Sequence, residues 1–270
     1  MPDLAQLKGV TEDLLCRFPH LYKRVLKLKS PDTIEKRLYL SLVRPGDVVV
    51  EGGANRGFYT RLFCRLVGKG GEVHAFEPFP ATFEKLKAAT ADCKKPPCFI
   101  NQAGLGEAPG DFDFNMPGTD DGHTSLRPHS FGAWENEAQV TVIKCRVTTL
   151  DEYAAEVGLK RLNFVKLDIE GAELPALRGG RKTLAQFQPI LVFELCATWM
   201  TNFGLTAADV LAELTALGYR KFWTQRDTVA RIASADLAES FSQAAIDPAN
   251  IVAVPEAVPI ERVEQMLRDC

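Results

Sequence analysis

Two acidic residues at the ends of short apolar segments are the side chains in this sequence best placed to do chemistry. Glu51 follows the segment 47–50, and Glu77 follows the segment 73–76. A glycine-containing turn, residues 52–57, begins directly after the first acid. Carboxylates accept hydrogen bonds from hydroxyl groups and attract cations, whereas they repel phosphates. The pattern therefore predicts a site for a ligand that carries hydroxyls or positive charge.

The residues around these acids predict a βαβ unit that would position them. Segment 47–50 is apolar and mostly β-branched, and segment 73–76 is also apolar, as expected for buried strands. Residues 56–67 place apolar side chains at helical spacing, and a run of glycines after residue 67 ends that helix. Parallel strands joined in this way are covered on both faces, and ligands bind in the crevice at their carboxyl ends.

The turn itself leaves two cofactors to weigh. Residues 52–57 approach a dinucleotide-binding fingerprint, with Glu77 where a ribose-binding acid is expected. Glu51, however, would repel the pyrophosphate of NAD, whereas S-adenosylmethionine brings an ammonium and a sulfonium and no phosphate. Asn55 suits a left-handed turn position and offers an amide to the methionine carboxylate. We expect S-adenosylmethionine; an NAD-dependent oxidoreductase and a turn that serves only packing are the alternatives.

A second group of carboxylates follows the apolar segment 162–167. Asp168 stands at the end of this predicted strand, and Glu170 and Glu173 follow on the next turn. Carboxylates so close raise one another's pKa, which suits a general base that activates a hydroxyl acceptor. The alternative is that Glu170 and Glu173 pair with backbone amides of the following helix. Lys166 shares a strand face with Asp168, and its simplest role is that of an ion-pair partner.

Histidine and metal chemistry are weaker alternatives. His123 lies in a glycine-flanked loop, residues 116–126, and is the other candidate base; it could equally be an exposed loop residue. His74 lies inside a predicted strand and is expected to be structural. A magnesium site formed by Asp168, Glu170 and Glu194 is conceivable, but nothing in their spacing demands one, so no metal is predicted.

Composition restricts the class of protein. The chain has 270 residues, 46% of them hydrophobic and 25% charged, and a net charge of −3, so nucleic acid is not the expected partner. No apolar run could span a bilayer and no signal peptide is recognisable, so a cytoplasmic location is expected. The seven cysteines form no Cys-x-x-Cys pair and are expected to be reduced, with Cys64 and Cys196 in the core.

The remaining segments predict one α/β domain with additions. Residues 1–44 form an N-terminal helical lead-in, and residues 45–270 form the main domain, in which residues 105–146 insert a β-hairpin near the site. The further strands are expected at 98–101, 162–167, 189–195 and 219–223, with an edge strand at 250–254. The further helices are expected at 82–91, 149–156, 173–185 with a break at Gly179–Gly180, 207–217 and 260–267.

One helix of the lead-in is both amphipathic and basic. In residues 20–29, Leu21, Val25 and Leu28 lie at helical spacing among four basic residues. We expect this helix to pack on its own domain with a solvated basic face. Peripheral contact with a membrane or a partner is the alternative.

Five motifs in order give the chain a family resemblance. They are Glu51-x-Gly-Ala-Asn-x-Gly57, Ala75-Phe-Glu-Pro78, Gly122-His-Thr-Ser-Leu126, Thr149-Leu-Asp-Glu-Tyr153 and Val165-Lys-Leu-Asp-Ile-Glu-Gly-Ala-Glu173. With them, residues 34–225 resemble the FkbM family of S-adenosylmethionine-dependent methyltransferases. The resemblance implies a Rossmann-like, doubly wound, mostly parallel seven-stranded sheet and methylation of hydroxyl groups on natural products or sugars. Glu51 stands where the family more often has aspartate, which keeps the charge.

The expected function is therefore O-methylation of a small molecule, with S-adenosylhomocysteine as the second product. A nucleic-acid methylase and a cofactor-binding scaffold without turnover are further alternatives. The residues expected to bind the cofactor are Glu51, Gly53, Asn55, Gly57, Phe58, Glu77, Pro78, Asn101, Gly104 and Asp168. Those expected to act in catalysis are Asp168, Glu170 and His123.

Overall fold

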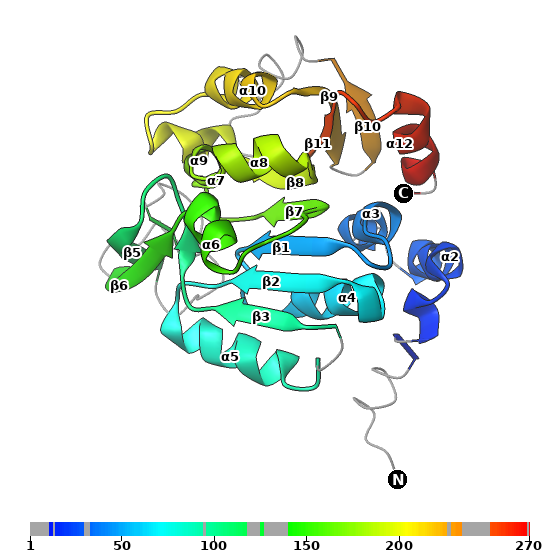
Figure 1. Ribbon diagram of the computed structural model, residues 1–270, viewed down its shortest axis with the longest axis horizontal. Helices are drawn as coiled ribbons and strands as arrows, with labels where there is room; N and C mark the ends of the chain where they lie inside the picture. The colour runs from blue at the N-terminus through cyan, green and yellow to red at the C-terminus, as the bar shows by residue number, and fades with distance from the viewer. Residues whose placement is uncertain are drawn as a thin grey trace.

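A central sheet covered by helices on both faces organises the protein (Figure 1). The structure is a computed structural model that describes residues 11–12, 14–29, 33–93, 96–117, 125–126, 140–225, 228–233, 249–268 and 270. The sheet has eight strands in the order β10-β9-β11-β8-β7-β1-β2-β3. Their bounds are β1 (Val48–Gly52), β2 (Glu72–Phe76), β3 (Cys98–Asn101), β7 (Phe164–Leu167), β8 (Ile190–Leu195), β9 (Tyr219–Gln225), β10 (Val229–Ile232) and β11 (Ala249–Pro255).

Most strand pairs in this sheet are parallel, which confirms the predicted Rossmann-like α/β fold. Strand β1 pairs in parallel with β2 and β7, and the pairs β2–β3 and β7–β8 are also parallel. Strand β11 runs antiparallel to both β8 and β9, and β10 runs antiparallel to β9. The sheet therefore carries one strand, β10, beyond the seven that were predicted.

The prediction of an edge strand at 250–254 is wrong. Strand β11 lies inside the sheet between β8 and β9, and the side chains from Ile251 to Val254 are fully buried. Burial of an uninterrupted apolar strand is most favourable in the middle of a sheet. There neighbouring strands form hydrogen bonds with its backbone on both edges, and helices cover both faces.

Two sets of helices form the outer layers. The hydrophobic cluster on one face joins α2 (Pro19–Lys29), α3 (Ile34–Leu42), α4 (Phe58–Val67) and α12 (Ile260–Leu267) to the sheet through Val49. The cluster on the other face contains Val48 and Val50 together with α6 (Leu150–Glu156), α7 (Glu173–Arg178), α8 (Arg181–Phe187) and α10 (Ala207–Ala216). Successive strand residues point to opposite faces, so one strand contributes to both clusters. Further helices are α5 (Pro80–Thr90), α9 (Ala197–Thr201) and the short 3₁₀ turn η2 (Gly68–Gly70).

The predicted break at Gly179–Gly180 is confirmed and separates α7 from α8. A Cβ atom at Gly179 would lie 1.9 Å from the carbonyl oxygen of Gly106, so no side chain fits there. Gly179 thus lets the helical layer approach the loop that precedes the inserted hairpin, and Gly180 lets α8 begin close to Leu150 of α6.

The predicted insertion is a small separate sheet. It contains β4 (Gly104–Leu105), β5 (Gly110–Pro117) and β6 (Val140–Thr148) in the order β4-β6-β5, and β5 and β6 form the expected antiparallel pair. Phe114, Cys145 and Val147 pack against Phe79, which follows β2. This contact joins the hairpin to the end of the central strands. The tip of the hairpin falls largely outside the described residues.

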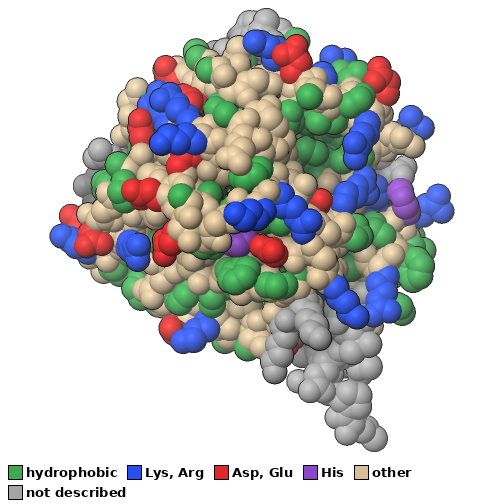
Figure 2. All heavy atoms as spheres, viewed as in Figure 1, with side chains coloured by type: hydrophobic (Ala, Val, Ile, Leu, Met, Phe, Trp, Pro, Cys, Tyr) green, Lys and Arg blue, Asp and Glu red, His purple; other side chains and the backbone are tan. Residues whose placement is uncertain are grey.

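The lead-in contains the predicted basic helix, α2, which contacts α3 as expected. Lys and Arg side chains gather on the side of the molecule where α2 lies (Figure 2). In the part of the chain that the structure describes, no helix has the length and apolar character needed to cross a membrane. All seven cysteines are free thiols, and Cys64 and Cys196 are buried as predicted.

Candidate functional site

The turn after β1 brings two strand ends unusually close together. Gly53 has a φ of +75°, and a Cβ atom there would lie 1.8 Å from the carbonyl oxygen of Asp168, which follows β7. Only glycine tolerates both the positive φ and this approach. Asn55 has a φ of +49°, so it occupies the predicted left-handed position. The backbone of the turn is therefore shaped by the need to pass between β2 and β7.

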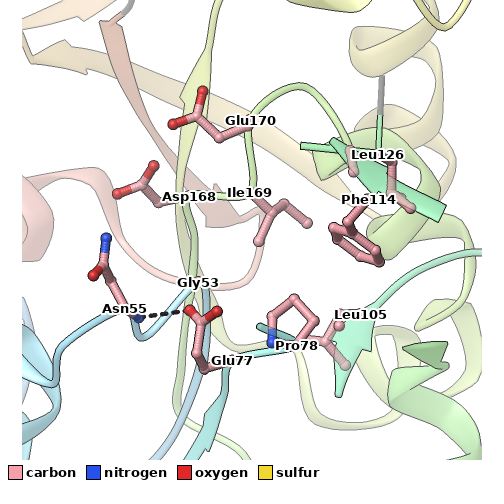
Figure 3. A pocket seen from close by; sticks show the side chains of 12 residues that line it. Gly53, Asn55, Glu77, Pro78, Leu105, Phe114, Leu126, Asp168, Ile169 and Glu170 are labelled. Atoms are coloured by element: carbon pink, nitrogen blue, oxygen red, sulfur yellow. Dashed lines mark hydrogen bonds between the residues drawn. The ribbon is translucent and has the colours of Figure 1, made fainter. Parts of the chain in front are cut away.

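The carboxylate of Glu77 is fixed beside this turn. One of its oxygens accepts the backbone N–H of Asn55 at 2.9 Å (Figure 3), and the other accepts the N–H of Phe79 at 3.0 Å. The two hydrogen bonds hold the carboxylate plane in one orientation at the carboxyl end of β2. Glu77 is buried and borders the cleft described next.

A cleft opens at the carboxyl ends of the central strands, where α/β folds bind ligands. It holds about 680 Å³ of empty space, part of it open to solvent. Its lining consists of Gly53, Asn55, Glu77, Pro78, Gly104, Leu105, Phe114, Leu126, Asp168, Ile169, Glu170 and Ala172. In Figure 3 the carboxylates and the Asn55 amide lie on one side, and the apolar side chains lie on the other. The cleft thus offers a polar part and an apolar part to one ligand.

Six of the predicted cofactor residues meet in this cleft. They are Gly53, Asn55, Glu77, Pro78, Gly104 and Asp168, and the predicted catalytic residue Glu170 lines it as well. The oxygen of the Asn55 side chain is buried and has no hydrogen-bond partner among the described residues. A buried acceptor of this kind normally has a donor, which points to a ligand group at this position.

Glu51 does not line the cleft. Its carboxylate is 1% exposed and accepts a hydrogen bond from the Thr60 hydroxyl at 2.6 Å. In the β1–β7 register it lies opposite Lys166. Burial raises the pKa of Glu51 to about 7, although the charge of Lys166 and the Thr60 hydrogen bond act in the opposite direction. Its place is therefore inside the protein, behind the turn.

Three other predicted cofactor residues also lie away from the cleft lining. The Asn101 amide donates to the backbone carbonyls of Ala75 and Phe99 at 3.2 and 3.3 Å, which fixes β3 against β2. Phe58, the first residue of α4, is 64% exposed, and its ring lies 5.3 Å from the ammonium of Lys36. Gly57 has a φ of +82° and lets α4 begin close to α5.

The predicted pair of Lys166 and Asp168 is confirmed. The Lys166 ammonium is 3.0 Å from Asp168 Oδ2, and the lysine is buried whereas the aspartate side chain is 39% exposed. Burial alone would lower the pKa of Lys166, but the charges of Asp168, Glu51 and Glu35 outweigh it and raise that pKa. Lys166 therefore remains a cation that orients Asp168 at the mouth of the cleft.

The turn after Asp168 is held from both sides. Glu173 is 2% exposed and accepts the backbone N–H of Ile169 at 3.0 Å and that of Gly171 at 3.4 Å. Burial raises the pKa of Glu173 to about 7, while these hydrogen bonds lower it. Glu170 has a φ of +56°, and its carbonyl oxygen accepts the hydroxyl of Ser125 at 3.0 Å. Glu173 thus binds backbone amides of the turn, whereas the predicted alternative to a catalytic role was pairing with amides of the following helix.

Ser125 and its neighbour were missed as site residues. Ser125 is buried and forms an antiparallel bridge with Asn115 of β5, and Leu126 lines the cleft beside Phe114. These contacts bring the returning part of the insertion onto the Asp168 turn. The motif at 122–126 was a signal that the segment mattered, but local sequence does not reveal a contact between residues 45 positions apart.

The histidine and metal alternatives have separate outcomes. His74 is buried, its Nδ1 lies 2.7 Å from the Tyr153 hydroxyl, and burial lowers its pKa, so it is structural as predicted. His123 lies outside the described residues. The described part of the chain holds no group of three or more His, Cys, Asp or Glu side chains suited to a metal. Asp168, Glu170 and Glu194 therefore do not form such a group.

Comparison with known proteins places these features in context. The family model described as "Methyltransferase FkbM domain" matches residues 51–221, more than half of the chain. The 2-O-methyltransferase NoeI of Sinorhizobium fredii is 22% identical over 188 residues, which are 66% of this chain and 76% of that protein. The 31-O-demethyl-FK506 methyltransferase FkbM of Streptomyces tacrolimicus is 52% identical over 46 residues, 17% of each chain. The solved structure of methyltransferase FkbM from Methylobacillus flagellatus is 16% identical with a TM-score of 0.46; the match covers 83% of this chain and 50% of that one.

Proposed function

This chain belongs to the methyltransferase FkbM family, and we propose that it transfers a methyl group from S-adenosylmethionine to a hydroxyl group of a small molecule. The observation that carries the proposal is the Glu77 carboxylate, which two backbone amides hold in place beside a cleft at the strand ends. A carboxylate fixed in this way suits the two hydroxyls of a ribose, because each oxygen can accept one of them.

The buried carbonyl of Asn55 supports the same ligand. It lacks a hydrogen-bond donor among the described residues, and it borders the cleft on the side of Asp168. An ammonium group would donate to this oxygen and be attracted by the Asp168 carboxylate. Pro78, Leu105 and Phe114 line the apolar part, which suits the flat face of an adenine. A pyrophosphate between the two carboxylates would instead be repelled, which disfavours NAD.

Two carboxylates in the cleft are suited to accept the proton of the acceptor hydroxyl. Asp168 is oriented by Lys166 and reaches solvent, and Glu170 lies on the same turn. The bound cofactor would supply an electrophilic methyl group, so that an O–CH₃ bond forms as the S–CH₃ bond breaks. Removal of the hydroxyl proton by one of these carboxylates makes the oxygen a better nucleophile. Of the three expected catalytic residues, His123 remains a prediction from the sequence.

Ligand titration tests the cofactor. S-adenosylmethionine and S-adenosylhomocysteine should raise the Tm of the protein and give a saturable heat of binding in calorimetry, and NAD should do neither. Glu77→Gln should weaken the binding of S-adenosylhomocysteine. Glu72→Gln, which removes a half-exposed acid beside His74 at the other end of β2, is the matched control and should leave that binding unchanged. Stabilisation by NAD alone would refute the proposed cofactor.

Isotope transfer tests the reaction. With S-adenosylmethionine labelled in its methyl group, hydroxylated acceptors should gain the label at oxygen, as NMR of the product would show. Asp168→Asn or Glu170→Gln should lower kcat while binding of S-adenosylhomocysteine persists. Label that appears on nitrogen would contradict O-methylation, and full turnover in both variants would contradict a carboxylate base. Binding without transfer to any acceptor would favour the scaffold alternative.

A further inference from the structure

The lead-in exposes a stripe of large apolar side chains that the domain does not cover. Leu14, Phe18, Leu21 and Leu28 are 56, 59, 53 and 89% exposed. Leu21 and Leu28 lie seven residues apart on one face of α2, whereas Leu14 lies in the helical segment before α2 and Phe18 lies in the bend directly before Pro19. Four exposed apolar side chains between residues 14 and 28 differ from the singly scattered apolar residues of an ordinary surface.

This stripe is distinct from the face by which α2 packs on the protein. Tyr22 and Leu26 are buried and belong to the hydrophobic cluster that contains α3. With 3.6 residues per turn, they point about 100–140° away from Leu21 around the helix axis. Tyr22 and Leu26 therefore attach α2 to the domain, and packing does not explain why Leu21 and Leu28 are apolar.

Basic residues flank the exposed stripe. Residues 14–29 contain five Lys and Arg and no Asp or Glu, although the chain as a whole has a net charge of −3. Arg17, Arg24 and Lys27 are exposed, whereas Lys23 turns inward and donates to the Ser41 hydroxyl at 2.9 Å. Figure 2 shows the resulting gathering of basic and hydrophobic side chains on this side of the molecule.

We propose that the N-terminal surface, formed by Leu21 and Leu28 of α2 and by Leu14 and Phe18 before it, with Arg17, Arg24 and Lys27, docks on an anionic lipid bilayer. A helix with exposed Leu and Phe side chains and flanking cations lies in the plane of a bilayer interface, with its apolar stripe below the headgroups. The cations then meet the negative surface potential of anionic lipids. This docking is independent of the methyl-transfer proposal and would bring the enzyme to acceptors held at a membrane surface.

Vesicle sedimentation with the full chain tests this docking. The protein should sediment with vesicles of phosphatidylcholine and phosphatidylglycerol in a ratio of about 7:3, and much less with phosphatidylcholine alone. Raising the salt concentration should release it, because exposed charges are screened. The double variant Leu21→Gln/Leu28→Gln should lower the partition coefficient about ten-fold or more, since two apolar side chains lose their burial. Each of Arg24→Gln and Lys27→Gln should lower it about five-fold.

The matched control is the double variant Val142→Gln/Val157→Gln, which replaces two exposed apolar residues on other elements and should leave the partition coefficient unchanged. Because Leu21 and Leu28 are exposed, their replacement should also leave the thermal unfolding curve unchanged. Three results would overturn the proposal: no binding to anionic vesicles at low salt, equal loss in the control, or binding that the Leu variant retains. The wild type could instead self-associate and bind no lipid. If Leu21→Gln/Leu28→Gln abolished that self-association, the surface would bind a second copy of the chain and the proposal would be overturned.

Discussion

Replacing Glu173 by Gln should make the protein more stable above neutral pH. Its carboxyl group is 2% exposed, and burial raises its pKa from 4.5 to about 7. A difference of about 2.5 pKa units corresponds to about 3 kcal/mol at 1.36 kcal/mol per unit. Gln keeps an oxygen that can accept the N–H groups of Ile169 and Gly171, and it never carries the charge. The variant therefore resembles the protonated wild type.

The sign of the pH dependence follows from proton binding. Between about pH 4.5 and pH 7 the folded state holds the Glu173 proton more tightly than the unfolded state does. The free energy of unfolding of the wild type therefore falls as the pH rises through this window, and this contribution levels off above about pH 7. The advantage of Glu173→Gln should be small at pH 5 and grow to about 3 kcal/mol at pH 8.

Urea unfolding at pH 5, 6, 7 and 8, followed by circular dichroism, measures this difference. Glu84→Gln, at an exposed acid paired with Lys87 on the same helix, is the control and should change stability by less than about 0.5 kcal/mol. A difference between wild type and Glu173→Gln that does not change with pH would refute the reasoning. A variant that is less stable than the wild type at pH 8 would show that the turn amides require the ionised carboxylate.

Three further substitutions test the rest of the site. Gly53→Ala should lower the free energy of unfolding by about 2 kcal/mol or more, because its Cβ would lie 1.8 Å from the Asp168 carbonyl oxygen. The control is Gly158→Ala, at a φ of +62° with open space around the position. It should lower the free energy of unfolding by only about 1 kcal/mol in the same urea titration. Glu77→Gln should weaken S-adenosylhomocysteine binding about ten-fold or more in calorimetry, because its NH₂ group would face a backbone N–H. Ser125→Ala should cost about 1 kcal/mol and speed hydrogen exchange across residues 168–171, since one buried hydrogen bond to that turn is lost.

Local patterns were enough to predict the scaffold of the site. The strands expected at 47–50 and 73–76 correspond to β1 and β2, with bounds that differ by at most two residues. Asn55 could be placed in a left-handed turn because few other residues tolerate that conformation. The ion pair between Lys166 and Asp168 followed from the two-residue period of a strand. Each of these inferences depends on neighbours in sequence.

Long-range contacts decided what could not be predicted. The apolar sequence of β11 is compatible with either an edge strand or a central strand. Only its pairing with β8 and β9 shows that it lies inside the sheet. Glu51 was predicted to bind the ligand; its carboxylate lies against Thr60 of α4 and outside the cleft lining, a contact that the local sequence does not indicate. Ser125 contacts Glu170 across 45 positions of sequence, and no local period indicates such a contact.

The position of Glu51 changes the electrostatic argument for a cationic ligand without removing it. Burial, together with the charges of Asp168, Glu173 and Glu170, raises the pKa of Glu194, so several carboxyl groups share one region of low polarity. Lys166 is a buried cation among them and is already paired with Asp168. Carboxylates held close together at a strand end favour a cation and oppose an anion. The proposed preference for a sulfonium and ammonium ligand over a pyrophosphate therefore rests on Glu77 and Asp168, which line the cleft, and it does not require Glu51 to touch the ligand.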